Sequence, residues 1–302
     1  MTRPSPEFAG GKPWGPVFST FWAGGTRSHR RERCRCRAYV PLVDGERVNP
    51  PKSDFDRLIE IAGATPFSGW DFSALEGRWK VGHPSWDYRA IAREHIAHTS
   101  SLLDLGTGGG EFLATLAPLP PKTLATEGYP PNLEVARRRL APLGVRVLAM
   151  LGDLQIPMPD ASVHLVLDRH EEFDPQEVHR VLLPGGRFVT QQVGASNCEE
   201  LRTKLGVEGT QFTNAVSSSR ALGEEISRAG FDIERHEEVK TSYEFLDVGA
   251  LVCFLRAAPW EVPGFSLTHH RKELEAIHHE IKTKGSFRAT HHLMLVIAQR
   301  PR

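Results

Sequence analysis

The sequence predicts an α/β protein with a doubly wound, mostly parallel sheet. Two observations predict this class. Short apolar segments alternate with segments of helical spacing between residues 88 and 240, and a glycine-rich turn joins the first apolar segment to a helix. The chain has 302 residues, of which 40% are hydrophobic, so it can build the core of one large domain.

Five apolar segments are predicted to be the parallel strands. They cover residues 101–105, 122–127, 145–150, 163–168 and 187–193. The helices expected between them cover residues 112–117, 133–140 and 175–183. Strand and helix alternate along this part of the chain, which favours parallel neighbours joined by helical crossovers.

Residues 53–98 are predicted to be an ordered segment before the first strand. Ser53 is a suitable cap for a helix over 54–62, and residues 88–98 have helical spacing. Aromatic residues crowd this segment, Trp86 and Tyr88 among them. We expect these aromatic rings to pack against the sheet; the alternative is a lid that closes over a ligand.

The N-terminal head, residues 1–52, is basic. It contains ten Lys or Arg against four Asp or Glu, whereas the rest of the chain carries a net charge of −6. We expect a flexible, disordered tail, because the segment lacks sustained periodicity. The alternatives are a nucleic-acid-binding arm and a translation start near Val48. Cys34 and Cys36 form only a weak zinc signal, since no second Cys or His pair lies nearby.

The composition excludes several classes of protein. No run of about 18 apolar residues is present, so we expect no membrane span. The start of the chain has no secretory pattern, and four cysteines are too few for a disulfide scaffold. We therefore expect a cytoplasmic protein that does not bind membranes.

The glycine-rich turn, residues 106–110, follows the first strand and precedes a helix. Glycines let a ligand approach the backbone closely and adopt φ angles that other residues avoid. An acid, Glu127, ends the second strand 17 residues after Gly110, which is close to the spacing expected for an acid that binds ribose hydroxyls. A dehydrogenase that uses nicotinamide would prefer a third glycine where Glu111 stands.

These motifs resemble those of class I S-adenosylmethionine-dependent methyltransferases, a family with a Rossmann-like sheet. Residues 102–110 match the family's first motif in full, a hydrophobic pair followed by Asp-x-Gly-x-Gly-x-Gly. Glu127 and Asp153 match the acids after the second and third strands. Residues 159–164 are similar to the approach to the fourth strand, with His164 replacing its last acid, and residues 177–188 match the phrase before the fifth strand.

The resemblance implies that S-adenosylmethionine is the cofactor of a small-molecule-type methyltransferase domain. The residues implied to bind it are Asp104, Gly106, Thr107, Gly108, Gly110, Glu127, Gly128, Asp153, Leu154 and Asp168. Among these, Asp104 is expected to meet the cationic methionine end, and Glu127 to accept bonds from two hydroxyl groups. Asp153 is expected to accept a bond from the adenine amino group.

In this family the last two strands usually form an antiparallel hairpin. Residues 231–235 and 292–298 are the candidates here, with a helical insertion over residues 247–290 between them. The insertion is too long for a bare loop, and we expect it to cap the acceptor pocket. A dimer interface or a packing appendage is the alternative.

The acceptor is expected beyond the ends of the fourth and fifth strands, where doubly wound folds bind ligands. His170 and Glu171 are therefore the catalytic candidates, and His170 is the better base because its unperturbed pKa lies near neutrality. The alternative is that they only cap and solvate a helix entry. Gln191 and Gln192 point to opposite faces in a strand, so at most one is expected to face a ligand.

No metal site is predicted. Methyl transfer to catechols would need an acidic or amide pair after the fifth strand, and the sequence has none there. The adjacent histidine pairs cannot chelate in the way that histidines spaced i, i+4 do, so they are expected to be surface residues. These pairs are His269–His270, His278–His279 and His291–His292.

The function that the sequence favours is methyl transfer from S-adenosylmethionine to a small molecule by in-line displacement. One alternative is an RNA methyltransferase that uses the basic head for affinity. The other is a module that binds the cofactor without turnover. The acceptor atom and the oligomeric state are left open.

Overall fold

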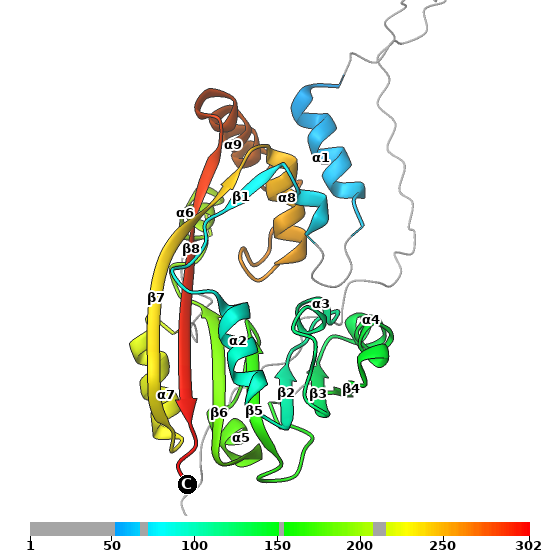
Figure 1. Cartoon of the computed structure of the whole chain (residues 1–302). Coiled ribbons are helices and arrows are strands. Elements are labelled where there is room, and N and C mark those ends of the chain that lie inside the picture. Colours follow the sequence, from blue (N-terminus) through cyan, green and yellow to red (C-terminus); the bar gives the residue numbers. More distant parts are fainter. Residues whose placement is uncertain (1–51, 67–71, 151–153, 208–215) are drawn as a thin grey trace, which may run out of the picture. The chain divides into compact units, whose positions relative to one another are not determined.

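The computed structural model describes residues 52–302 apart from residues 67–71, 151–153 and 208–215. In this part of the chain, one eight-stranded sheet has the order β1-β7-β8-β6-β5-β2-β3-β4 (Figure 1). The parallel strands are β2 (Ser101–Leu105), β3 (Lys122–Glu127), β4 (Arg146–Ala149), β5 (Val163–Arg169) and β6 (Leu182–Val193). The antiparallel strands are β1 (Trp79–Val81), β7 (Asp232–Phe245) and β8 (Phe287–Gln299). The predicted fold class is confirmed.

Helices cover both faces of the parallel part of the sheet. One face packs against α2 (Tyr88–Ala97), α3 (Glu111–Ala114) and α4 (Pro130–Leu140). The other packs against α5 (Pro175–Val181) and α7 (Ser219–Arg228). Trp86 and Tyr88 are buried against the first of these faces, which confirms that they pack on the sheet.

The two antiparallel strands are much longer than the sequence predicted. They pair from Asp232 with Gln299 to Phe245 with Phe287, whereas β6 ends where Val193 faces Leu293. β8 runs opposite to β6. The residues of β8 that precede Leu293, together with their partners on β7, therefore extend past the carboxyl ends of the parallel strands. Thus the sequence located the hairpin correctly but missed this extension.

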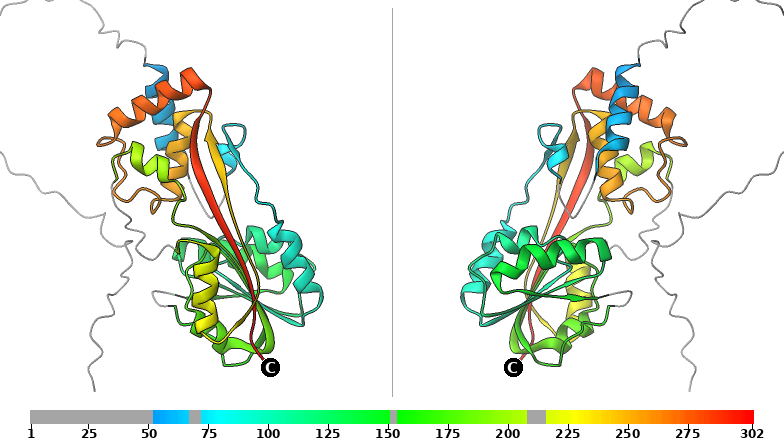
Figure 2. Two further views of the ribbon diagram at one scale, coloured as in Figure 1. Left: turned by 90° about the vertical axis from the view of Figure 1, so that its left-hand side faces the viewer. Right: turned by 90° about the vertical axis from the view of Figure 1, so that its right-hand side faces the viewer.

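The helical insertion is built on that extension. It contains α8 (Val248–Ala257) and α9 (Arg271–Lys284), which share a separate apolar core with α1 (Asp54–Ala64) and α6 (Glu199–Lys204) (Figure 2). The insertion therefore lies at the same end of the sheet as the carboxyl ends of the parallel strands.

Two polar contacts fix the segment before the first parallel strand. Ser53 accepts a bond from the Asp56 amide, which confirms the predicted cap of α1. Arg78 forms a two-bond ion pair with Asp247, at 2.9 Å from Nε and 2.6 Å from Nη2, and Asp247 also caps α8. Bidentate pairs of this kind have a fixed geometry, so this pair orients the insertion relative to β1.

Several predictions lie outside the described residues. These are the basic head with Cys34 and Cys36, the alternative start near Val48, and Asp153. Among the helices of the described segments, none has the length and apolar character needed to cross a membrane.

The expectation of surface histidines is wrong for His291 and His292, which are both buried in β8. The Ser196 amide donates to Nδ1 of His292 at 3.3 Å, and His292 Nε2 lies 3.0 Å from the Glu238 carboxylate. The ring also lies directly against the α-carbon of Gly194, where a Cβ atom would overlap it. The close packing of these two residues thus requires a glycine at position 194 and a flat ring at position 292.

We predict that Gly194→Ala lowers the free energy of unfolding by about 2–3 kcal/mol, because the added methyl group overlaps a buried ring that has no room to move. Gly223→Ala is the matched control. Its new Cβ meets only Ile233, at 3.9 Å, inside α7, so alanine should stabilise that helix by about 0.5–1 kcal/mol. Urea denaturation of both variants checks this, and equal stabilities would contradict the packing described.

Candidate functional site

The candidate site lies where the carboxyl ends of β2, β3, β5 and β6 meet. Four carboxyl groups come together there, from Asp104 on β2, Glu127 on β3, Asp168 on β5 and Glu171 in the loop after β5. Burial raises the pKa of each of them, and repulsion from neighbouring acids adds to that shift. The edge is therefore suited to a ligand that carries positive charge or hydrogen-bond donors.

The glycine turn lies between β2 and α3. Three of its glycines have positive φ angles, 59° at Gly106, 62° at Gly108 and 80° at Gly110. The turn is tied to β3, since Thr126 accepts bonds from the Gly106 amide through Oγ1 and from the Thr107 amide through its carbonyl oxygen. The sequence predicted this turn correctly because its geometry depends on local residues.

Gly106 is required for a second reason. The Glu171 side chain lies directly against its α-carbon, and any Cβ atom at position 106 would overlap the Glu171 carboxyl group. Glu171 thus covers the first glycine of the turn. Burial raises the pKa of this carboxyl to about 7, with Glu127 and Glu172 adding to the shift.

Asp104 is almost fully buried at the end of β2, with 5% of its surface exposed. Burial raises its pKa to about 7, although the nearby Thr107 hydroxyl and the Arg169 guanidinium oppose the shift. Thr107 lies beside this carboxyl group, and its own buried hydroxyl oxygen has no partner at ordinary hydrogen-bond distance among the described residues. A buried acid and a buried hydroxyl without a partner are features of a site that awaits a polar ligand.

Glu127 is also 5% exposed and is held by its own turn. Its Oε1 accepts a bond from the Tyr129 amide at 2.6 Å. Burial raises the pKa of Glu127, whereas the amides of Tyr129, Gly108 and Gly128 oppose that shift. These backbone amides therefore orient the carboxyl group. Its remaining lone pairs can accept hydrogen bonds from a ligand that has hydroxyl groups.

Asp168 occupies a different place from the other acids. Its side chain is completely buried, and it accepts bonds from the Glu171 amide, the Thr190 hydroxyl and the Gln192 amide group at 3.0–3.2 Å. Gln192 also donates to the Glu171 carbonyl oxygen at 2.9 Å. This geometry favours a role in which Asp168 holds the loop after β5, because its acceptor sites face the protein.

His170 lies at the start of that loop in a left-handed conformation, with φ at 72°. Such a conformation is unfavourable for a residue other than glycine and indicates a constrained position. The residue is exposed to solvent on one side, and desolvation by the neighbouring protein together with Arg169 lowers the pKa of its imidazole. Its Nε2 lies 3.2 Å from Nε2 of Gln191.

Both glutamines of β6 reach this loop. Gln191 is buried and contacts Trp86 and His170, while Gln192 bonds to Asp168 from the other side. The two side chains lie on opposite faces of β6, as the alternation of side chains along a strand predicted. The sequence did not predict that both would organise the same loop.

Three further residues of the site were not predicted. The Tyr88 hydroxyl is shared between the carbonyl oxygens of Asp168 and Val189, at 2.9 and 3.1 Å. The Arg169 guanidinium lies over the Phe112 ring, 4.4 Å from its centre. The only signal for these contacts in the sequence was the position of Tyr88 in the segment before the first parallel strand. That position could not identify the partners of its hydroxyl group.

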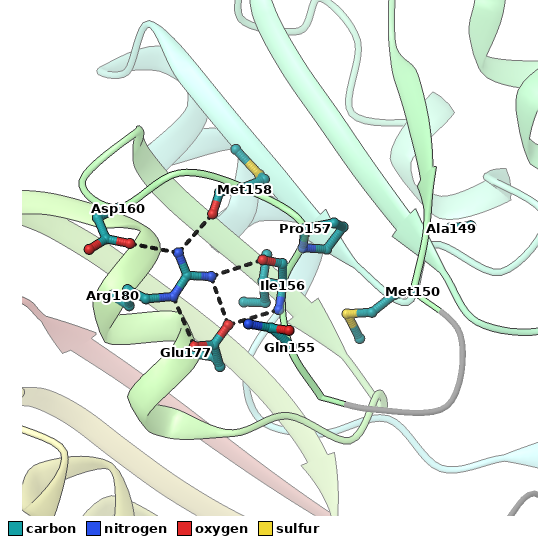
Figure 3. A pocket seen from close by; sticks show the side chains of 9 residues that line it. All are labelled: Ala149, Met150, Gln155, Ile156, Pro157, Met158, Asp160, Glu177 and Arg180. Atoms are coloured by element: carbon teal, nitrogen blue, oxygen red, sulfur yellow. Dashed lines mark hydrogen bonds and ion pairs between the residues drawn. The ribbon is translucent and has the colours of Figure 1, made fainter.

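A depression of about 660 Å³ lies beside the loop that leads away from β4 (Figure 3). Arg180 borders it but is fully engaged, because it donates to Glu177, Asp160 and the carbonyl oxygens of Met158 and Ile156. The guanidinium group thus holds the segment from Ile156 to Asp160 and is not available to a ligand. Of the two predicted residues nearby, Leu154 is half-buried and Asp153 lies outside the described residues.

No group of three or more His, Cys, Asp or Glu residues in the described segments is arranged to hold a metal ion. His278 lies beside the Phe55 ring, and His270 lies beside Phe265. Aromatic contacts therefore account for these two histidines.

Comparisons with known proteins find similarity to methyltransferases. Residues 103–190 match the model of a family described as "Methyltransferase domain". An uncharacterized methyltransferase-like protein of Schizosaccharomyces pombe is 31% identical over 126 residues, which cover 39% of this chain and 46% of that protein. A protein of Micromonospora griseorubida named "Putative 23S rRNA (guanine-N(1)-)-methyltransferase" is 26% identical, over 51% of this chain and 52% of that protein.

The chain thus spans about half the length of these two relatives. A solved structure of a functionally unknown protein from Deinococcus radiodurans R1 has the same fold, with a TM-score of 0.50 and 17% identity. The match covers 74% of this chain and 90% of that one. This structural likeness concerns the fold alone.

We predict that Asp104→Asn removes a pH dependence of stability. An acid with a raised folded-state pKa keeps its proton in the fold where the unfolded chain has lost it, so stability falls as pH rises from about 4 to 7. Between pH 5 and pH 8, the wild type should lose about 2–3 kcal/mol of unfolding free energy relative to the variant.

Urea denaturation across this pH range measures the difference. Asp232→Asn, at an exposed carboxyl group on β7, shows whether the loss of one negative charge alone has such an effect. Parallel stability curves for the wild type and Asp104→Asn would contradict the raised pKa of the buried Asp104 carboxyl group.

Proposed function

Because this chain contains a class I methyltransferase domain, we propose that it transfers a methyl group from S-adenosylmethionine to a small-molecule acceptor. The observation that supports this most directly is the pair of buried acids, Asp104 and Glu127, on either side of a glycine turn at the ends of adjacent strands. Their carboxyl groups can accept hydrogen bonds and attract positive charge, so they fit a ligand with a cationic end and two neighbouring hydroxyls.

The residues at this edge would divide the binding of S-adenosylmethionine among them. Glu127 would accept bonds from the ribose hydroxyls, and the backbone of residues 106–110 would allow close approach. Asp104 would face the positively charged methionine end, with Thr107 and its unpartnered hydroxyl beside it. Gly128, Asp153 and Leu154 are proposed to border the adenine, and Asp168 to support the loop between the cofactor and the acceptor.

When bound, S-adenosylmethionine supplies a methyl group on a positively charged sulfur. The chain then has to hold the acceptor in line with that methyl group and exclude water. His170 and Glu171 follow the end of β5, and we propose that they border the acceptor. Glu171 has to leave the α-carbon of Gly106 if a ligand is to contact the turn there, so we expect this side chain to move on binding.

The proposal of a small acceptor draws on a row of rings in the part of the sheet that carries the insertion. The rings of Trp79, Tyr243 and His291 stack in sequence on β1, β7 and β8, with centroid separations of 5.8 and 4.3 Å. These strands belong to the extension that carries the helical insertion. We propose that the insertion and these rings close a partly apolar acceptor pocket, as ligand sites of small molecules usually require.

RNA is the alternative acceptor. It is supported by the net charge of +6 on residues 1–52 and by the printed name of the Micromonospora relative. Salt-sensitive binding of RNA that disappears when residues 1–51 are deleted would favour this alternative. Binding of the cofactor without methylation of any acceptor would favour a non-catalytic module.

We predict that the purified protein binds S-adenosylmethionine and S-adenosylhomocysteine with micromolar affinity in calorimetric titrations. Glu127→Gln should weaken both by about 10- to 100-fold, because a neutral amide replaces a charged acceptor of two hydroxyls. Glu134→Gln, at an exposed position on α4, is the matched control and should leave both affinities unchanged. Absence of binding to folded protein, or equal affinities for wild type and Glu127→Gln, would refute the proposed site.

A further inference from the structure

We propose that Gln191, oriented by Trp86, holds His170 as a neutral imidazole with its proton on Nδ1, so that His170 donates a hydrogen bond to the acceptor and does not serve as the base. The tautomer is a property of the fold. Its use toward an acceptor rests on the proposed function. Gln191 and Trp86 are then positioning residues.

The first step of the argument is the orientation of the Gln191 amide. The Trp86 indole nitrogen lies 2.8 Å from Oε1 of Gln191, and both side chains are buried. An indole N–H can only donate. The reverse orientation of the amide would place two donors against each other in a buried place, so Trp86 fixes Oε1 toward itself and Nε2 toward His170.

The second step concerns the imidazole. The Gln191 Nε2 group has only N–H donors, and it lies 3.2 Å from Nε2 of His170. His170 Nε2 must therefore accept this bond through its lone pair, which places the single proton of the neutral ring on Nδ1. The His170 amide also donates to the Gln191 carbonyl oxygen at 2.9 Å, so main chain and side chain act together.

The third step is the cost of a second proton. A proton on Nε2 would face the N–H donors of Gln191, and the bond between them would be lost. The other charged or titratable groups that influence the ring, Arg169 and His291 on β8, also disfavour the imidazolium. Lowering of the His170 pKa agrees with this geometry.

The chemical consequence is a division of roles in the loop. Within the described residues, Nδ1–H of His170 has no hydrogen-bond partner, so it would suit an acceptor that presents a lone pair, such as a carbonyl, carboxylate or deprotonated hydroxyl oxygen. Any proton that an acceptor loses would have to go elsewhere. The neighbouring Glu171 carboxyl group is placed to receive it, because it lies in the same loop and is not engaged in an ion pair in the described structure.

Nuclear magnetic resonance of the imidazole nitrogens tests this without any acceptor. In the ¹⁵N-labelled full chain, with the His170→Gln variant used for assignment, His170 should show a protonated Nδ1 and an unprotonated Nε2 from about pH 5.5 to pH 8. In Gln191→Glu, a carboxylate can accept from both Trp86 and His170. The proton should therefore move to Nε2, and the apparent pKa should rise by about one unit or more.

Two more variants keep the test sharp. Trp86→Phe keeps a ring but removes the donor that orients the amide, so His170 should become a mixture of tautomers. Gln176→Glu adds the same charge at an exposed position on α5 and should leave the His170 signals unchanged. A wild-type His170 that carries its proton on Nε2, or that titrates near pH 6.5, would overturn the proposal, as would an unchanged tautomer in Gln191→Glu.

The result of the NMR test can be distinguished from a test of the proposed function. Calorimetric titration of the same samples with S-adenosylmethionine reports on the glycine turn and Glu127, which Gln191 does not contact. A fixed Nδ1–H tautomer without cofactor binding would sustain the positioning network and refute the methyltransferase proposal. Cofactor binding with a freely titrating His170 would support the methyltransferase proposal and refute the positioning network.

Discussion

The buried carboxyl group of Asp168 is the interaction on which the arrangement of the site depends. It lies at the end of a central strand and receives donors from its own loop and from β6, through the Glu171 amide, Thr190 and Gln192. A buried acid without such partners would be costly, so these three donors and the acid require one another. Because the loop after β5 is held here, Glu171 is placed over Gly106 and His170 is placed beside Gln191.

The other acids of this edge also carry a cost of burial. Asp104 and Glu127 are buried, and among the groups that influence Asp104 in the described structure only Arg169 is a cation. Desolvation therefore opposes their ionisation, and the fold carries this cost in the absence of a ligand. A ligand with a positive charge and hydroxyl donors would relieve it. The cost of burying these acids in the free protein and the affinity for such a ligand are thus two consequences of one arrangement.

The sequence was sufficient for features whose causes are local. The glycine turn follows from the backbone angles of Gly106, Gly108 and Gly110, and the acid at Glu127 follows from its place at a strand end. The contacts that complete the site are not local. Trp86 and Gln191 are 105 residues apart, and Tyr88 bonds to carbonyl oxygens 80 and 101 residues away. Neither composition nor periodicity carries information on which side chains meet across such separations. The length of β7 was missed for a related reason, since its last three residues pair with the early β1.

The most direct test of this account is the number of protons that the protein releases when it binds S-adenosylmethionine. Calorimetric titrations at pH 7 in buffers of different ionisation enthalpy measure this number. If a cationic ligand lies against carboxyl groups that are partly protonated in the free protein, then S-adenosylmethionine should release protons, and neutral S-adenosylhomocysteine should release fewer. Equal proton release by the two ligands would contradict the account, because it would mean that the acids of this edge do not sense the charge on the sulfur.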